Sequence, residues 1–277
     1  MYKISLIAFM LIVSSGITSA QTLSDIIAAR SDEVRQRDVY RHPQQTIEFF
    51  QLAPEMSVAE ALPGSGWYTK IIAPYIGAKG SVHGINYNDD MWARFGFFSE
   101  SNIAERIAST AQFPKQVADI ISPSPSAQGF TFAKPPVSLT GTVDRILFIR
   151  ALHNLNRFES EAGTMSQAIA TAHTLLKDDG MVGIVQHRAP EDAPEKWADG
   201  SNGYLKQSAV ITLFEQGGFK LKATSEINAN PKDKPTSDDF VWRLPPSYNG
   251  ANGDPDKIKK ANAIGESDRM TLLFVKR

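Results

Sequence analysis

The sequence predicts an α/β protein with a doubly wound, mostly parallel seven-stranded sheet and helices on both faces. Three observations predict this fold class. Apolar segments of strand length recur along the chain, segments with helical periodicity separate them, and the first strand ends in a tight glycine-containing turn that leads into a helix. Strands separated by helices form βαβ units, in which right-handed crossovers join parallel strands. With 277 residues, the chain is long enough for one such domain.

The first βαβ unit lies at residues 58–86. Its first strand and turn occupy the segment 58–68 (VAEALPGSGWY), a helix begins at about Trp67, and the segment 81–86 (SVHGIN) forms the second strand. Two helices precede this unit. One is charged and amphipathic at 22–38, and the other is short, at 44–52, with Pro43 in a first-turn position.

The remaining elements continue the alternation. A helix is predicted at 102–111, whereas 114–136 is rich in Pro and Ser and is expected to be irregular apart from a weak strand at 130–133. The nearly continuous apolar run 143–152 (VDRILFIRAL) predicts a buried strand. The later elements are a helix at 159–176, a turn at 177–180, a strand at 181–186, a helix at 203–216, and strands at 219–227 and 270–276.

A long insertion at 228–269 separates the last two strands within the single domain predicted for residues 21–277. It holds five of the sixteen prolines of the chain and shows little periodicity. Trp242, Leu244 and Tyr248 are its candidate apolar anchors. An insertion of this length favours a lid over the ligand site, and a surface loop packed only for stability is the alternative.

The turn after the first strand has the features of a site for a nucleotide-like cofactor. Gly64 and Gly66 lack side chains that would keep the backbone away from a ligand, and glycine adopts dihedral angles that other residues avoid. The following helix would direct its free N–H groups and the positive end of its dipole at the ligand. In open α/β sheets such ligands bind at the carboxyl ends of the strands.

This turn resembles the first motif of the class I S-adenosylmethionine-dependent methyltransferases, in which an acid at the end of the first strand precedes alternating glycines. Glu60 takes the acid position, Gly64 and Gly66 take the second and third glycine positions, and Leu62 replaces the first glycine. Three longer segments are similar to those of a group of exported predicted methyltransferases: 63–75 (PGSGWYTKIIAPY), 225–233 (SEINANPKD) and 264–276 (IGESDRMTLLFVK).

The resemblance implies a Rossmann-like methyltransferase fold and S-adenosylmethionine as the cofactor. At Asn86 the family usually has an acid for the two ribose hydroxyls, and an amide lacks the charge-assisted bonds of a carboxylate. Asp89 and Asp90, one turn later, are candidates to replace that acid. The cofactor-binding residues implied by the resemblance are Glu60, Pro63, Gly64, Ser65, Gly66, Trp67 and Asn86.

Methyl transfer is a direct displacement at a sulfonium carbon, so it requires alignment and, for some acceptors, a general base. His153 and His187 are predicted to follow neighbouring strands at the ligand edge of the sheet, which makes them the candidate bases or substrate contacts. Arg188 is the candidate clamp for an acidic substrate. The alternative for each histidine is a structural role, in which it satisfies loop carbonyls.

The composition limits the partners. The 29 basic and 30 acidic side chains nearly cancel, so no large basic field indicates nucleic acid as a substrate. The absence of cysteine excludes disulfides, thiolate catalysis and cysteine-based zinc sites. A small-molecule substrate is expected, and the sequence does not indicate an oligomeric state.

The N-terminus predicts export. Lys3, the apolar run 4–13 and the small residues before Gln21 form the pattern of a signal peptide over residues 1–20, cleaved near Ala20. An uncleaved membrane anchor is the alternative, and no later segment is expected to span a bilayer. The expected location is periplasmic or secreted, which a chain without cysteine fits.

Three functions are compatible with these features. The first is an exported methyltransferase that acts on a small molecule or a protein. The second is a non-catalytic periplasmic ligand-binding protein on the same scaffold, which the export signal and the missing acids favour. The third is a metal-binding protein that uses His153, His187 and either Asp89 or Asp90 as ligands.

Overall fold

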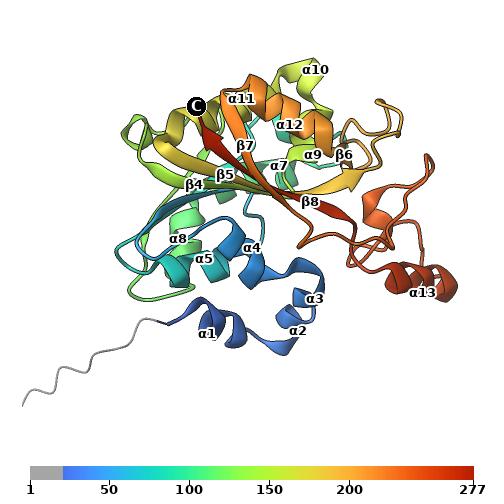
Figure 1. Ribbon diagram of the computed structural model, residues 1–277, viewed down its shortest axis with the longest axis horizontal. Helices are drawn as coiled ribbons and strands as arrows, with labels where there is room; N and C mark the ends of the chain where they lie inside the picture. Colours follow the sequence, from blue (N-terminus) through green and yellow to red (C-terminus); the bar gives the residue numbers. More distant parts are fainter. Residues whose placement is uncertain (1–20) are drawn as a thin grey trace, which may run out of the picture.

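The computed structural model describes residues 21–277, in which one open sheet separates two layers of helices (Figure 1). The predicted signal peptide, residues 1–20, lies outside the described residues. Among residues 21–277, none of the helices is both long and apolar enough to cross a membrane.

Seven strands form the sheet in the order β3-β2-β1-β4-β5-β8-β7, and a short eighth strand, β6, pairs with β5. The strands from β3 to β5 are parallel to one another, whereas β8 is antiparallel to both of its neighbours. This arrangement confirms the predicted fold class. The bounds are β1 Ser57–Ala61, β2 Ser81–Asn86, β3 Ser126–Thr131, β4 Val143–Ile149, β5 Leu176–Ala189, β6 Leu205–Lys206, β7 Phe219–Ser225 and β8 Arg269–Lys276.

Helices cover both faces of this sheet (Figure 1). The lower layer in that view contains α1 Leu23–Ala28, α2 Asp32–Arg35, α3 Asp38–Arg41, α4 Pro43–Phe49, α5 Thr69–Ile76 and α8 Phe113–Ala118. The upper layer contains α9 Leu152–Arg157, α10 Glu159–Ala162, α11 Thr164–Leu175 and α12 Gln207–Gln216. Between β2 and α8 the chain forms α6 Met91–Arg94 and α7 Glu100–Ala111, and the insertion contains α13 Pro255–Ile264. Short 3₁₀ helices occur at Val137–Leu139 and Val241–Arg243.

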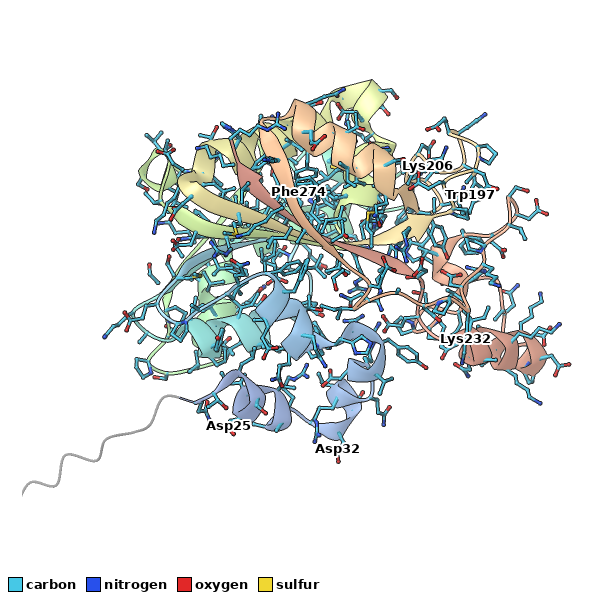
Figure 2. The ribbon with its side chains drawn as sticks, in the orientation of Figure 1. Asp25, Asp32, Trp197, Lys206, Lys232 and Phe274 are labelled. Atoms are coloured by element: carbon cyan, nitrogen blue, oxygen red, sulfur yellow. The ribbon has the colours of Figure 1, made fainter. Side chains whose placement is uncertain are left out.

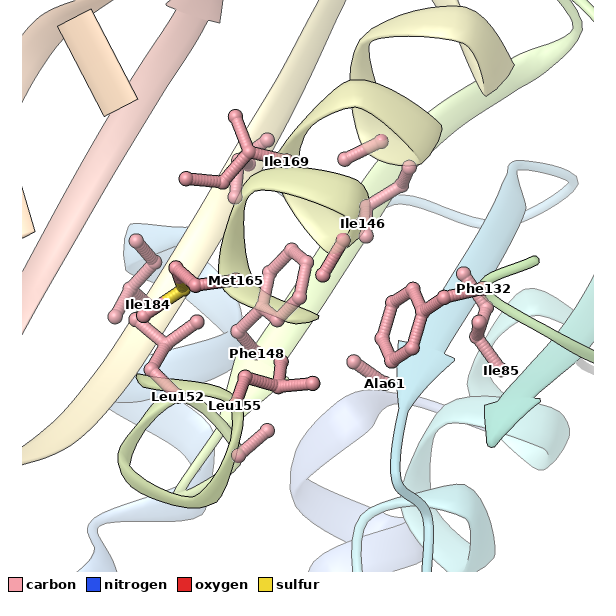
Figure 3. Packing of buried hydrophobic residues seen from close by; sticks show 14 of the residues in the cluster. Ala61, Ile85, Phe132, Ile146, Phe148, Leu152, Leu155, Met165, Ile169 and Ile184 are labelled. Carbon is pink, nitrogen blue, oxygen red and sulfur yellow. The ribbon is translucent and has the colours of Figure 1, made fainter. Parts of the chain in front are cut away.

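Two apolar cores join these layers. In the core above the sheet, Phe148 of β4 stacks on Phe132 with their ring centroids 6.2 Å apart (Figure 3). Phe274 of β8 packs there against Phe214 of α12, and its position between strand and helix is visible in Figure 2. The core below the sheet contains the side chains that α1, α4, α5 and α8 bury. Each large apolar side chain buried in this way contributes roughly 1.5–3 kcal/mol to folding.

Several segments differ from the sequence-based expectation. The helix expected at 22–38 is divided into α1, α2 and α3, because the extended backbone of Ser31 begins a new helix and Arg30 turns back to pair with Asp38. The stretch 114–136, expected to be mostly irregular, contains α8 and β3. Pro114 lies in the first turn of α8, where it removes no helical hydrogen bond. A Cβ on Gly129 of β3 would lie 1.8 Å from the Thr110 carbonyl oxygen, so this strand is defined by close helix packing and not by an apolar pattern.

The strands that precede the two candidate histidines also end at other residues than expected. β4 ends at Ile149 and α9 follows, so His153 lies in the first turn of a helix. β5 continues to Ala189, and His187 is therefore paired within the ladder, opposite Arg269 of β8. The expected helix at 159–176 is interrupted at Gly163, whose φ is +61°.

Candidate functional site

A cavity of about 590 Å³ lies at the carboxyl ends of β1 and β2. The turn after β1, the end of β2, the region of α6 to α8, α9 and the insertion all contribute to its walls. Trp242 and Asn249 show that the insertion reaches the cavity. The lining residues are Leu62, Pro63, Gly64, Gly84, Asn86, Tyr87, Trp92, Phe95, Phe97, Phe98, Arg106, Ser109, Thr110, Phe113, Gln116, Asn154, Arg157, Trp242 and Asn249.

The turn after β1 exposes backbone to this cavity. Leu62 has a φ of +54°, and its N–H donates to the Ile85 carbonyl oxygen at 2.7 Å, which joins the turn to β2. Gly64 has a φ of +58°, and a Cβ added to it would have its nearest neighbour, the Leu62 carbonyl oxygen, at 3.9 Å. The space over Gly64 is therefore open, and a ligand can approach its backbone closely.

The other candidate residues of the turn lie outside the cavity wall. Ser65 is exposed, and Gly66, with a φ of +75°, is buried against Thr69. The Trp67 ring is packed between two guanidinium groups, with the Cζ atoms of Arg30 and Arg41 at 4.9 and 4.7 Å from its centroid. Trp67 therefore fixes the base of the turn.

Glu60 lies beneath the turn and is 4% exposed. The hydroxyl of Thr69, the first residue of α5, donates to its carboxylate at 2.5 Å. Burial raises the pKa of Glu60 to about 7, although the hydrogen bond from Thr69 acts in the opposite direction. The carboxyl group supports the turn from below and does not line the cavity.

The raised pKa of Glu60 predicts a pH-dependent stability. Because the pKa is about 7 in the folded chain and 4.5 as the reference value, the stability is full below pH 4.5 and falls as the pH rises through 7. The difference between these two pKa values corresponds to a loss of roughly 3 kcal/mol in the free energy of unfolding above pH 7. Glutamine cannot ionise, so Glu60→Gln avoids this loss. We expect the free energy of unfolding of the variant, minus that of the wild type, to be roughly 2 kcal/mol larger at pH 8 than at pH 5. Urea unfolding at both pH values measures this, with Glu55→Gln as the exposed control, and an equal effect at both would contradict the buried, protonated carboxyl.

Asn86 lines the cavity and is held in one orientation. Its side-chain Nδ2 donates to the hydroxyl of Thr110 on α7 at 2.9 Å, and its Oδ1 accepts the N–H of Tyr87, also at 2.9 Å. The amide is therefore positioned at the end of β2 by both its own backbone neighbour and α7.

The structure brings His153 and His187 together, with ring centroids 5.5 Å apart, but neither side chain lines the cavity. His187 exchanges a 2.6 Å hydrogen bond with the hydroxyl of Ser267, and His153 lies 3.4 Å from Oε1 of Gln186. Burial lowers the pKa of His153 to about 4 and lowers that of His187 well below its ordinary value. Both rings are therefore neutral at pH 7. The His153 ring contacts Trp242 of the cavity wall, at 5.8 Å between ring centroids.

Arg188 lies in a separate hollow of about 370 Å³. It pairs with Asp268 at 2.8 Å and with Glu226 at 2.7 Å, and the hydrogen bonds that it donates to Glu226 and Asp268 raise its pKa. Its charge is thus already balanced by protein carboxylates.

The four residues of the metal hypothesis do not converge. Asp89 pairs with Lys134 at 3.6 Å and Asp90 with Arg94 at 2.9 Å, whereas both histidines are buried and lie against each other. Within residues 21–277, no three His, Asp or Glu side chains form a group that could hold a metal ion.

Sequence reasoning missed most of the cavity wall. Trp92, Phe95 and Phe98 form an aromatic cluster in which Trp92 and Phe98 meet edge to face at 5.8 Å. Arg106 of α7 and Arg157 of α9 lie beside this cluster. The density of aromatic residues at 92–98 is the one local signal that could have indicated this wall.

A buried arginine cluster lies outside the cavity wall. One carboxylate, Glu266 of the insertion, pairs with Arg37 at 2.6 Å, Arg41 at 3.3 Å and Arg269 at 3.1 Å. Arg41 and Arg269 are 2% and 3% exposed. Burial alone would raise the pKa of Glu266, but the three arginines outweigh it and lower the pKa below its ordinary value.

No protein-family model matches this chain, and no curated protein matches it. Solved structures share its fold. A geranyl diphosphate methyltransferase in complex with S-adenosylmethionine matches with a TM-score of 0.53 and 12% identity, over 92% of this chain and 90% of that one. The geranyl diphosphate C-methyltransferase from Streptomyces coelicolor A3(2) matches with a TM-score of 0.52 and 11% identity, over 86% of this chain and 77% of that one. The cyclase SpnF matches with a TM-score of 0.52 and 13% identity, over 86% of this chain and 80% of that one. The chain therefore has the fold of the class I S-adenosylmethionine-dependent methyltransferases.

Proposed function

We propose that this chain binds S-adenosylmethionine in the cavity and transfers the methyl group to a small molecule. The position of the cavity carries the proposal. It lies at the carboxyl ends of β1 and β2, beside the point between β1 and β4 where the strand order changes direction, over the open backbone of Gly64 and beside Asn86. Its volume is within the range of roughly 300–1,000 Å³ that is usual for ligand pockets.

The residues of the wall fit this cofactor. Gly64 admits close approach of a ligand to the backbone, and the Asn86 amide can bond a ribose hydroxyl. The ring of Tyr87 beside Asn86 offers an aromatic surface for a purine, and it is held edge to face by Trp92 at 4.9 Å.

The cofactor, when bound, supplies a methyl group on a positively charged sulfur. The residues of the chain hold and align the reactants and exclude water from them. In the part of the chain that the structure describes, no Asp, Glu, His or Lys side chain lines the cavity. The acceptor that this wall favours is therefore a nucleophile that needs no proton removed at neutral pH.

Calorimetric titration of residues 21–277 with S-adenosylmethionine and S-adenosylhomocysteine tests the proposal. We expect micromolar affinity for both compounds. A protein that is folded by its thermal transition and binds neither would contradict it.

Asn86→Asp is expected to strengthen cofactor binding by roughly fivefold, because a carboxylate at the end of β2 accepts stronger, charge-assisted bonds from ribose hydroxyls. The Thr110 hydroxyl, which now accepts from Asn86, can donate to the new carboxylate. Titration with S-adenosylhomocysteine measures the change, and Asn88→Asp provides a nearby control outside the wall. A variant that gains nothing would indicate that the ligand is not a ribonucleoside.

A second candidate function is a ligand-binding protein on the same scaffold. Two departures from the methyltransferase motif favour it: Leu62 replaces the first glycine, and Asn86 replaces the ribose-binding acid. One matching structure is of a cyclase, so the fold by itself does not fix the chemistry. This candidate predicts a folded protein that does not bind S-adenosylmethionine.

We further propose that the chain is exported and acts in the periplasm or outside the cell, on the basis of the N-terminal pattern at residues 1–20. Expression of the full chain in a bacterial host, followed by fractionation and N-terminal sequencing, tests this. We expect an extracytoplasmic product that begins at Gln21, and a cytoplasmic product with an intact N-terminus would contradict export.

A further inference from the structure

We infer that the methyl acceptor is an acid with an aromatic-sized apolar body, whose anionic group is bound by Arg106 and Arg157. The assignment of this ligand as the acceptor rests on the proposed function. The evidence for its chemistry is the charge and the shape of the cavity wall, and both can be tested without any methyl transfer.

Arg106 and Arg157 carry the positive charge of the wall and come from two separate helices, α7 and α9. Within residues 21–277, neither guanidinium forms an ion pair with a carboxylate, whereas the neighbouring Arg94 pairs with both Asp90 and Glu161. Two guanidinium groups without counter-ions at one cavity create a positive potential there. Their planar set of N–H donors matches a carboxylate or another oxyanion.

Aromatic rings hold both guanidinium groups in place. The Cζ atom of Arg106 lies 4.2 Å from the ring centroid of Phe98 and 5.0 Å from that of Trp92. The Cζ atom of Arg157 lies 5.1 Å from the ring centroid of Phe158. Stacking of this kind restricts the long side chain but leaves its N–H edge available, so less conformational entropy is lost when an anion binds.

The same part of the wall is apolar. Trp92 and Phe95 are 8% and 9% exposed, so their rings are fixed by packing. Phe97, in contrast, is 68% exposed and also lines the cavity, which places an apolar side chain at its mouth. Rings of this size provide contact area for a flat apolar group beside the two arginines.

The charge of the cofactor favours an anion over a neutral acceptor. S-adenosylmethionine carries a sulfonium, an ammonium and a carboxylate, so its binding adds positive charge to a wall that already holds two arginines. A negatively charged acceptor offsets this excess, whereas a cationic acceptor adds to it. A substrate anion therefore also strengthens binding of the cofactor beside it.

Calorimetric titration with a matched pair of probes tests the inference: 2-naphthoate, and its uncharged analogue 2-naphthamide. We expect the wild type to bind the acid at least tenfold more tightly than the amide, in the presence of saturating S-adenosylhomocysteine. Arg106→Gln and Arg157→Gln should each reduce affinity for 2-naphthoate by roughly tenfold and leave affinity for 2-naphthamide unchanged. Arg94→Gln is the control, because it removes a nearby arginine whose charge is already paired, and thermal melting verifies that each variant is folded.

The outcomes separate this inference from the proposed function. If the protein binds S-adenosylhomocysteine but does not prefer the acid, or binds neither probe, the inference is overturned and the cofactor site is left intact. Preference for the acid that survives both arginine substitutions would also overturn it. A third outcome is that the wild type prefers the acid, both variants lose this preference, and the protein does not bind S-adenosylhomocysteine. That outcome would support the anion site and contradict the methyltransferase proposal.

Discussion

Replacement of Gly64 by valine is expected to abolish cofactor binding, with a loss of affinity of more than about 100-fold. The reason is local: the space over Gly64 is open, and its φ of +58° directs any side chain into that space. A β-branched side chain there would hold the ligand away from the backbone, and it would also strain the turn by roughly 1–2 kcal/mol. Titration with S-adenosylhomocysteine measures the loss of affinity.

The control for this substitution is Gly163→Val. Gly163 has nearly the same dihedral angle, with a φ of +61°, and a Cβ added there would meet nothing within 4 Å. It lies between α10 and α11 and does not line the cavity. Both variants therefore carry a similar backbone strain, and only Gly64→Val should lose the ligand. Equal affinity in the two variants would show that the ligand is bound elsewhere.

Replacement of Glu266 by glutamine is expected to destabilise the fold by roughly 3–5 kcal/mol, because it leaves buried arginines without their shared counter-ion. Glu266 is 4% exposed and pairs with Arg37, Arg41 and Arg269. Its pKa is lowered in the folded chain, so its contribution is present above pH 4.5 and is lost as the pH falls below that value. Urea unfolding at pH 7 measures the main effect, and the difference from the wild type should shrink in acid.

Glu161→Gln is the matched control, since this exposed carboxylate pairs with Arg94 at the surface and should contribute less than about 1 kcal/mol. A loss of stability at pH 7 no larger than that of Glu161→Gln would mean that water or an external anion neutralises the buried arginines.

The sheet could be predicted from the sequence because parallel strands are buried on both faces. The run 146–149 (ILFI) is apolar at every position, and the burial of β4 confirms the interpretation. β3 lacked such a run, since Gly129 and Gln128 occupy its centre. Its identity depends on contact with α7, which no local pattern encodes.

The residues of the candidate site that lie at the end of a strand could be predicted from the sequence, whereas those that come from distant segments could not. Pro63 and Gly64 come shortly after β1 and Asn86 ends β2, so a strand assignment places them at the ligand edge, and they line the cavity. His187 was also placed near that edge. Side chains alternate along a strand, however, and because β5 continues past residue 187 the ring turns to the face below the sheet. The two arginines of the wall come from helices about 50 residues apart, so only the folded chain brings them to one cavity.

The arginine cluster also has a consequence for the order of folding. Its central carboxylate, at position 266, joins side chains from the first helices, and the hydrogen bond between Arg37 and Glu266 spans 229 residues. Contacts that close so long a loop form late, because the chain between them must first be ordered. The segment that contains Arg37 and Arg41 therefore acquires its final packing only after nearly the whole chain has been synthesised, whereas α1 and α4 also pack against α5, which is close in sequence. In a truncated or nascent chain, the segment of α2 and α3 would remain accessible to a protease until the last strand joins the sheet.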